Sequence, residues 1–302
     1  MAIQRELWAR EINENLYAAL APALKAATDD SKYVASKTVH IPNAGSPATI
    51  QKNPTLPLST GTRTDNDLTY NIDTYAINPV AVPDYEQAML EYDKFQSVLN
   101  DITMGLPERV LAELTISWYT DATNKVLTTG AAYAAHAPAA TGTRKGLTTA
   151  ELKAAAAKLD QMKVPQGDRF FIVDTVMWYQ LLDELGISSY RDAVMAKESG
   201  QPDIPLYGFN IIVLPTVAYC SAAYAVRAYG ATGAATDQAI ALAVHKSALS
   251  YAFGSVEVFE EVSASYLGRV VSGYVQAGGS YRRYDKKGVV PIIQDATAGS
   301  PG

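Results

Sequence analysis

The sequence predicts an α+β protein, and three features of the 302-residue chain lead to this prediction. An apolar stripe with helical spacing runs from Tyr85 to Trp118. Residues 148–215 alternate helix, strand, helix and strand, which is typical of an α/β lobe. From Val256 onward, the segments have the alternation and turn residues of β-strands.

Residues 3–24 are predicted to form an amphipathic helix. Large apolar side chains recur there at three- to four-residue steps, and they are Ile3, Leu7, Trp8, Ile12, Leu16, Leu20 and Leu24. The polar face mixes acidic and basic residues, unlike the Lys/Arg-rich face of a membrane-surface helix. We therefore expect the helix to dock on protein, either on its own domain or on a neighbouring molecule, with Trp8 as a candidate contact.

Residues 37–72 have strand-like ends and a centre with almost nothing to bury. Between Asn43 and Asp67 the chain has three prolines, five threonines and no aromatic residue. The large apolar side chains of this stretch are Ile50, Leu56 and Leu58. A ribbon of this composition cannot build its own core, so we expect these three side chains to contact a neighbouring molecule.

A long helix is predicted to follow the ribbon. Asp84 is a good N-cap, and Gln87 lies at the capping-box spacing. If the helix continues to about Thr120 it spans ~54 Å. Gly105 and Pro107 interrupt the pattern, so a kink or a break is expected there, and two helices of a bundle are the alternative.

The rest of the chain alternates between clear elements and loops. Thr148 and Glu151 predict a capped helix, followed by the strand "RFFIVD", a helix that ends at Gly186, and the strand "FNIIVLP". A further apolar strand is expected in "QAIALAVHKSAL". The densest basic cluster, residues 282–287, is interpreted as a solvated hairpin tip around Asp285 and Gly288.

Composition excludes several classes of protein. The formal net charge of −6 argues against a broad basic face for nucleic acid. Cys220 is the only cysteine, which rules out an internal disulfide and a cysteine-based zinc site. The longest apolar run is broken by Pro215 and is shorter than the ~20 residues of a membrane helix.

No motif with a catalytic or metal-binding mechanism is present. His40 is interpreted as a solvent-side strand residue, and His136 lies far in sequence from any acidic residue. His245 and Ser247 are expected ~6.6 Å apart along one strand, beyond hydrogen-bond reach. Glu260 and its neighbour Glu261 should point to opposite faces of a strand. We expect no catalytic residue, no cofactor, no metal and no enzymatic activity, unless residues from distant segments converge.

The order of these parts resembles that of tailed-phage major capsid proteins, whose Hong Kong 97-type fold is also used by encapsulins. The resemblance rests on "KTVHIP" before the ribbon, on the long helix after "VPDYEQ", and on the closing stretch. That stretch reads "ALAVHKSALSYAFG" and then "YLGRVVSGYVQAGGSYRRYDKKGVVPI", similar to the end of many such chains.

The resemblance implies a domain division. Residues 1–37 would form the N-terminal arm and 38–82 the E-loop, the ribbon that lies across a neighbouring subunit. The peripheral (P) domain would take 83–145, including the spine helix, and 246–272. The axial (A) domain would take 146–245 and 273–295, and residues 296–302 would be a disordered tail.

The resemblance also implies a function. The protein would be a structural virion protein that assembles with itself into hexamers and pentamers of an icosahedral shell around double-stranded DNA, without sequence-specific binding. A scaffolding protein and a portal are the other expected partners, with the host cytoplasm as the site of assembly and no membrane. Lys52 and Asn53 are adjacent and do not form the Lys–Asn cross-linking motif of some members. The alternatives are an encapsulin-type compartment shell and an α/β enzyme.

Overall fold

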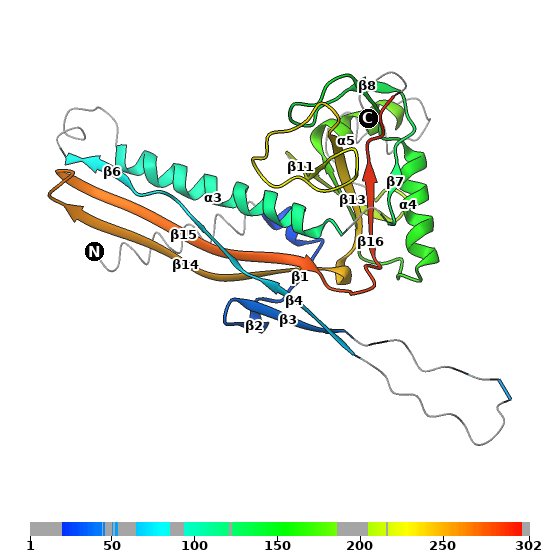
Figure 1. Ribbon diagram of the computed structural model, residues 1–302, viewed down its shortest axis with the longest axis horizontal. Coiled ribbons are helices and arrows are strands. Elements are labelled where there is room, and N and C mark those ends of the chain that lie inside the picture. The colour runs from blue at the N-terminus through cyan, green and yellow to red at the C-terminus, as the bar shows by residue number, and fades with distance from the viewer. Residues whose placement is uncertain are drawn as a thin grey trace.

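The computed structural model of the protein describes residues 20–43, 45, 50, 52–53, 65–84, 94–120, 123–185, 205–215 and 217–297. For residues 66 and 94–104 it describes the backbone only. The molecule has an elongated hairpin lobe and a rounder α/β lobe, and a narrow ribbon leaves the body near the point where they meet (Figure 1).

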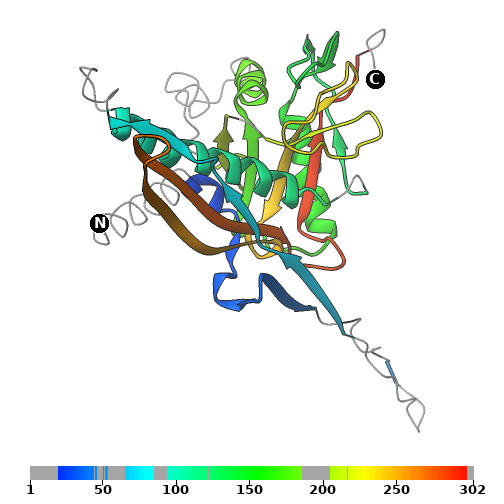
Figure 2. The same ribbon diagram turned by 60° about the vertical axis from the view of Figure 1, so that its left-hand side comes forward.

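The hairpin lobe is built on two long antiparallel strands, β14 (Leu249–Ser263) and β15 (Gly268–Tyr281). β15 also pairs with β5 (Asp73–Ala76) and β6 (Val80–Pro83), while β14 pairs in parallel with β1 (Thr28–Asp29). The helix α3 (Lys94–Trp118) lies along this sheet (Figures 1 and 2). The β-structure expected from Val256 onward is therefore confirmed.

α3 packs closely on the sheet because its contact stripe meets a strand with glycine at the crossing. Val110, Leu114 and Trp118 follow at helical spacing and are buried in one core with β15. A Cβ on Gly279 would lie 2.6 Å from the Leu114 side chain, so only glycine permits this approach. The Trp118 indole N–H donates to the Ser250 carbonyl at 2.9 Å.

The break expected in the long helix does not occur within the described residues. α3 continues from Lys94 to Trp118 with Pro107 inside it. Pro107 is buried and Leu106 is 3% exposed, so packing of the apolar stripe holds the helix together across a residue that lacks a backbone donor. Gln87 of the expected capping box lies outside the described residues, whereas Asp84 is described and its backbone N–H donates to the Leu267 carbonyl at 3.0 Å.

The α/β lobe has a mixed sheet with the order β11-β10-β13-β16-β7. Its strands are β11 (Phe209–Leu214), β10 (Arg169–Asp174), β13 (Gln238–His245), β16 (Val289–Ile293) and β7 (Val126–Leu127), with β12 (Tyr219–Cys220) paired to β13. The β10–β11 and β16–β7 pairs are parallel, and the other pairs are antiparallel.

Two helices cover one face of this sheet, α4 (Thr149–Gln161) and α5 (Thr175–Leu185). The opposite face shares a core with α3, so a single apolar cluster joins the two lobes. The predicted alternation of helix and strand is confirmed. The predicted capping box is also confirmed: the Thr148 side chain accepts from the backbone at the start of α4, and the Glu151 side chain accepts from the Thr148 backbone N–H.

The remaining elements are short. They are β2 (Val34–Ala35), β3 (Thr38–Asn43), β4 (Asn66–Asn71), β8 (Ala132–Ala134), β9 (Thr143–Lys145) and the 3₁₀ turns η1 (Ser31–Tyr33) and η2 (Lys246–Ala248). β2, β3 and β4 form a three-stranded antiparallel sheet at the root of the ribbon (Figure 1).

Both ends of the described chain are tied to the body. Leu20 is fully buried in the core that contains α3, so this end of the predicted N-terminal helix docks on its own domain. Ala296 forms an antiparallel β-bridge with Arg144, and the Thr297 N–H donates to the Thr143 carbonyl at 3.3 Å. The expectation of a disordered tail is thus wrong for residues 296 and 297, because their backbone continues the pairing with β9.

Replacing Trp118 by alanine should lower the free energy of unfolding by about 3–5 kcal/mol. The change empties a fully buried site and removes the donor to the Ser250 carbonyl. Urea denaturation measures the effect. Tyr284→Ala is the control, since Tyr284 is 65% exposed and its loss should change stability by about 0.5 kcal/mol or less. Equal stability of the two variants would contradict the packing described here.

Candidate assembly surfaces

The described part of the chain contains no cluster of three or more His, Cys, Asp or Glu residues that could hold a metal ion. None of the helices described is both long and apolar enough to cross a membrane. Glu260 is buried while Glu261 is exposed, which confirms that the two carboxylates point to opposite faces of β14. The three histidines and the buried ion pairs are the remaining candidates for a functional polar site.

The contact between His245 and Ser247 corrects an expectation. His245 Nδ1 lies 2.8 Å from Ser247 Oγ, although strand geometry placed them out of reach. The prediction is wrong because the chain turns into η2 directly after His245, which brings residues i and i+2 together. The same nitrogen accepts from the Ser247 backbone N–H at 3.2 Å, so His245 caps a turn. Burial lowers the pKa of His245.

The other two histidines each meet a carboxylate from a distant segment. His40 Nδ1 lies 2.7 Å from Asp67 Oδ2 across β3 and β4, on the exposed side of the ribbon root. His136 Nε2 lies 2.5 Å from Asp174 Oδ2. The other Asp174 oxygen accepts from the Met177 N–H at 2.6 Å at the start of α5, so His136 ties its loop to a helix cap. These are structural roles.

The ribbon root has one apolar and one polar face. Val39, Ile41, Tyr70 and Ile72 form a small core with Ala252 of β14. On the polar side, His40 pairs with Asp67, and the Gly45 N–H donates to the Asp65 carboxylate at 2.7 Å. The root is therefore fixed to the body, whereas Ile50, farther along the ribbon, is 96% exposed.

The junction beneath the ribbon root contains a buried carboxylate. Asp30 is 2% exposed, and its Oδ2 lies 3.1 Å from Arg282 Nε. Burial raises the pKa of Asp30, while Arg282 and Ser250 offset part of this effect. Burial likewise raises the pKa of Tyr70 to about 12. The junction joins β4 of the ribbon, β14 and the segment that follows β15.

The far end of the β14–β15 hairpin exposes several large apolar side chains. They are Phe259 (50% exposed), Val262 (62%), Tyr266 (57%) and Leu267 (66%). Gly268 is held tightly against β6, since a Cβ there would lie 2.1 Å from the Val82 carbonyl oxygen. The turn is thus anchored at its base, while these four side chains remain exposed.

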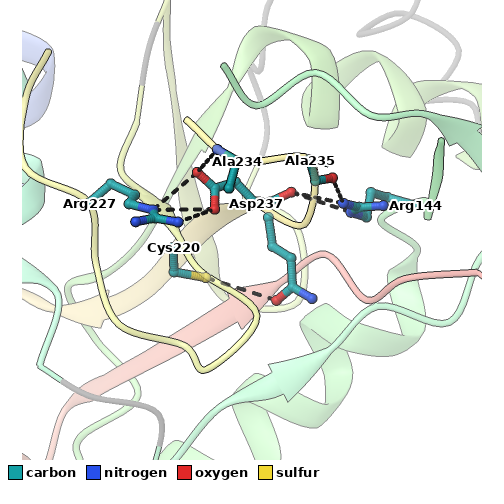
Figure 3. Close-up of polar contacts among 7 residues, drawn as sticks. Arg144, Cys220, Arg227, Ala234, Ala235 and Asp237 are labelled. Atoms are coloured by element: carbon teal, nitrogen blue, oxygen red, sulfur yellow. Dashed lines mark hydrogen bonds and ion pairs between the residues drawn. The ribbon is translucent and has the colours of Figure 1, made fainter. Parts of the chain in front are cut away.

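A polar lock holds the long connection between β12 and β13 in place (Figure 3). Asp237 is 1% exposed, and its carboxylate receives three contacts of 2.8–3.2 Å from the Arg227 guanidinium. On the other side, the buried Arg144 donates to the backbone oxygens of Asp237 and Ala235 at 2.9–3.3 Å (Figure 3). The lock fixes the connection to the β8–β9 hairpin.

The pKa values in the lock follow from these contacts. Burial alone would raise the pKa of Asp237, but the bonds from Arg227 and the Ala234 N–H outweigh it and leave the pKa below its ordinary value. Burial lowers the pKa of Arg144 and raises that of the nearby Cys220 thiol to about 12. Cys220 is therefore an inert thiol at neutral pH.

A cavity of about 290 Å³ lies between α3 and this connection. Glu108 and Ile116 of α3 line one side, and Tyr229 and Arg227 line the other. The Arg109 guanidinium stacks over the Tyr229 ring at 3.6 Å. Asp237, which also lines the cavity, is already paired with Arg227.

The residues predicted to contact a neighbour are only partly described. Ile50 is the exposed side chain that the prediction requires, but its contact with another molecule stays a prediction. Trp8, Leu56 and Leu58 lie outside the described residues. The exposed apolar side chains of the hairpin end were not predicted. Their signal in the sequence is the apolar residues around the turn "SASYLG", namely Phe259, Val262, Tyr266 and Leu267.

Solved structures resemble this fold over most of its length. The capsid of Cyanophage P-SCSP1u aligns with a TM-score of 0.60 and 17% identity, covering 90% of this chain and 87% of that chain. The capsid of Ralstonia phage GP4 gives 0.61 and 12%, covering 92% and 89%. The acidic stable capsid of Helicobacter pylori bacteriophage KHP30 gives 0.60 and 12%, covering 90% and 88%. No protein-family model matches the sequence, and no curated protein is significantly similar to it.

Replacing Asp237 by asparagine should lower the free energy of unfolding at pH 7 by about 1–3 kcal/mol, because Arg227 loses a buried charged partner. The pKa of Asp237 is depressed, so its contribution is present above the ordinary carboxyl pKa and is lost as the pH falls through the folded-state value. The difference between the two proteins should therefore shrink toward acid pH. Urea titrations from pH 7 downward measure it.

Asp183→Asn is the control for this pH dependence. Its side chain is exposed on α5, where a substitution should change stability by about 0.5 kcal/mol or less. A pH-independent difference between the wild type and the Asp237 variant would show that the lock owes nothing to the carboxylate charge.

Proposed function

Because the chain has the Hong Kong 97-type capsid fold, we propose that it is the major capsid protein of a tailed bacteriophage. It would assemble with itself into the hexamers and pentamers of an icosahedral shell that encloses double-stranded DNA. The observation that carries the proposal is the extent of the likeness, since about nine-tenths of this chain aligns with about nine-tenths of each capsid chain. The expected virion location follows from it.

Two surfaces support a role in assembly. The ribbon carries Ile50 at 96% exposure, and the hairpin end carries Val262, Tyr266 and Leu267 at 57–66%. Both lie away from the cores that hold the subunit together. Burial of such side chains against another subunit would stabilise a contact by about 25 cal/mol per Å² of apolar area.

The sheets suggest domain boundaries that differ from those expected from the sequence. An E-loop over 38–72 fits better than 38–82, because β5 and β6 pair with β15. A P domain of 73–120 and 249–281 follows the hairpin lobe, since β15 stays in one sheet to Tyr281. The A domain would then take 123–248 and 282–297, including β7, which pairs with β16. Residues 1–37 remain the proposed N-terminal arm, and α3 the proposed spine helix.

The other proposed partners are a scaffolding protein and a portal, with assembly in the host cytoplasm. An encapsulin-type shell would share the fold but enclose protein. The capsids that resemble this chain belong to phages, which favours DNA as the content. We propose no enzymatic activity, and the buried carboxylates of Asp237, Asp30 and Asp174 are paired with Arg227, Arg282 and His136.

Electron microscopy of the purified protein, produced alone and with proteins encoded beside it, tests the proposal. Closed icosahedral particles are expected, and particles from infected or induced cells should contain nuclease-protected DNA. Particles filled with a protein cargo would favour the encapsulin alternative. A protein that stays monomeric under all of these conditions would rule out a shell of either kind.

Replacing residues 46–64 by a short Gly-Ser turn should abolish shells and leave the melting temperature of the monomer nearly unchanged. The excision keeps the root, including the bond from Gly45 to Asp65, and removes the part that has few apolar side chains. Calorimetry and electron microscopy measure the two effects. Outright unfolding of the shortened protein would mean that the ribbon packs on its own subunit.

Replacing Val262, Tyr266 and Leu267 by serine should also prevent assembly, because it removes most of the apolar area at the hairpin end. The monomer should lose about 1 kcal/mol or less, since these side chains are already in water. Val176→Ser with Tyr179→Ser, on the exposed side of α5, is the matched control. If the triple variant assembles as well as the wild type, the hairpin end has no role in assembly.

A further inference from the structure

The molecule carries a cationic surface at the root of the ribbon, although its net charge is −6. We name it the basic apex and define it by its charged side chains, Lys32, Lys246, Arg283, Lys286 and Lys287. Three segments lie together there. The Arg282 side chain pairs with Asp30, and the Arg282 backbone N–H donates to the Ala248 carbonyl. Thr28 Oγ1 donates to the Lys246 carbonyl. Figure 1 shows the β15–β16 connection beside the ribbon root.

The carboxylates in or beside these segments, Asp29, Asp30, Asp168 and Asp285, are outnumbered by Arg282 and the five cations of the apex. Asp285 accepts from Arg283 at 2.7–2.9 Å and pairs with Lys287 at 3.4 Å, so one anion serves two cations. Asp30 is buried and engaged by Arg282. Lys32 and Lys246 are exposed and have no carboxylate partner within the described part of the chain. Tyr33 and Tyr284 are about two-thirds exposed in the same segments, at 66% and 65%.

An acidic surface of matching composition lies on the outer face of the hairpin. We name it the acidic face and define it by Glu257, Phe259, Glu261 and Tyr274. Residues 257, 259 and 261 alternate with the buried Val258 and Glu260, so the three share the face opposite α3. Phe259 stacks on Tyr274 at 5.9 Å. No ion pair joins Glu257 or Glu261 to a cation in the residues that the structure describes.

The two surfaces cannot meet within one molecule. The basic apex lies in η1, η2 and the loop after β15, whereas the acidic face lies along the two strands. Within β14, Leu249, next to η2, is separated from Glu257 by about 26 Å at ~3.3 Å per residue. In a head-to-tail contact, the cation-rich end of one copy lies on the anion-rich face of a second copy, and the opposite charges pair. Such heterologous contacts close into rings when the rotation between copies permits it.

We propose that the basic apex of one subunit docks on the acidic face of the next, with Lys246 and Lys287 opposite Glu257 and Glu261. This inference deepens the proposed function and rests on it, because it names the pairing within the shell. The aromatic side chains on both surfaces favour a protein partner, since exposed Tyr and Phe are enriched in protein interfaces. Packaged DNA is the competing occupant of the basic apex.

Charge reversal with rescue tests the pairing. The variants are Lys246→Glu with Lys287→Glu, Glu257→Lys with Glu261→Lys, and all four changes in one chain. Each double variant should raise the protein concentration needed for assembly by about tenfold or more, because like charges then face each other. The fourfold variant should recover most of this loss, and ~1 M salt should reduce the differences by shortening the Debye length to ~3 Å.

Lys153→Glu with Lys163→Glu is the matched control, since both side chains are exposed on or just after α4 and the formal charge changes equally. It should assemble like the wild type. Thermal unfolding of every variant verifies that the monomers fold. A fourfold variant no better than either double variant overturns the pairing, as does normal assembly of the Lys246/Lys287 variant with reduced DNA retention, which would assign the apex to DNA.

Carbodiimide cross-linking provides a readout that does not need closed shells. Applied to a mixture of light and heavy-isotope wild-type protein at high concentration, it should join Lys246 or Lys287 of one copy to Glu257 or Glu261 of another. Mass spectrometry identifies the mixed-isotope links. Shells that form without these links would leave the proposed function standing and overturn the pairing, whereas a protein that forms neither shells nor links contradicts both.

Discussion

The packing of α3 on the β14–β15 hairpin is the interaction on which the rest of the structure depends. The hairpin is two long strands with short partners, and such a ribbon is marginal in water without a covering element. α3 supplies that cover through Leu114 and Trp118, and Gly279 lets the helix approach closely. The same helix also reaches the α/β sheet, so one apolar cluster makes the two lobes a single body.

Ser250 shows how the ribbon is connected to this body. Its carbonyl accepts from Trp118 of α3, and its hydroxyl donates to the Ser280 carbonyl across the hairpin at 3.2 Å. Tyr70 of the ribbon and the pair of Asp30 and Arg282 lie beside it. The direction in which the ribbon leaves the molecule is therefore set by buried contacts with the helix and the hairpin.

The sequence was sufficient to predict most of the elements, because their signals are local. The Thr148 capping box, the α/β alternation and the late strands depend on spacing and caps, and each lies where it was expected. The apolar stripe of α3 likewise outweighed Pro107, whose local signal favoured a break. Where tertiary packing competes with a local preference, the sequence shows both tendencies but does not show which one is stronger.

The candidate surfaces were harder to predict, because they depend on contacts between distant segments. The fold alone brings His136 to Asp174 and Arg144 to Asp237. His245 contacts Ser247 because the strand expected in "QAIALAVHKSAL" ends at His245 and the chain turns there. Domain boundaries near 272 and 145 followed the resemblance, whereas strand pairing carries β15 to Tyr281 and ties β9 to the chain end. Pairing partners are not encoded by periodicity.

The residues that stabilise the fold differ from those that lie on its outer face. The buried carboxylates of Asp30, Asp174 and Asp237 hold loops to the body through their ion pairs and contribute to the stability of the fold. The exposed Glu257, Glu261 and Val262 contribute little to it, because water already surrounds them. The exposed residues can therefore change without loss of the packing of α3 on the hairpin.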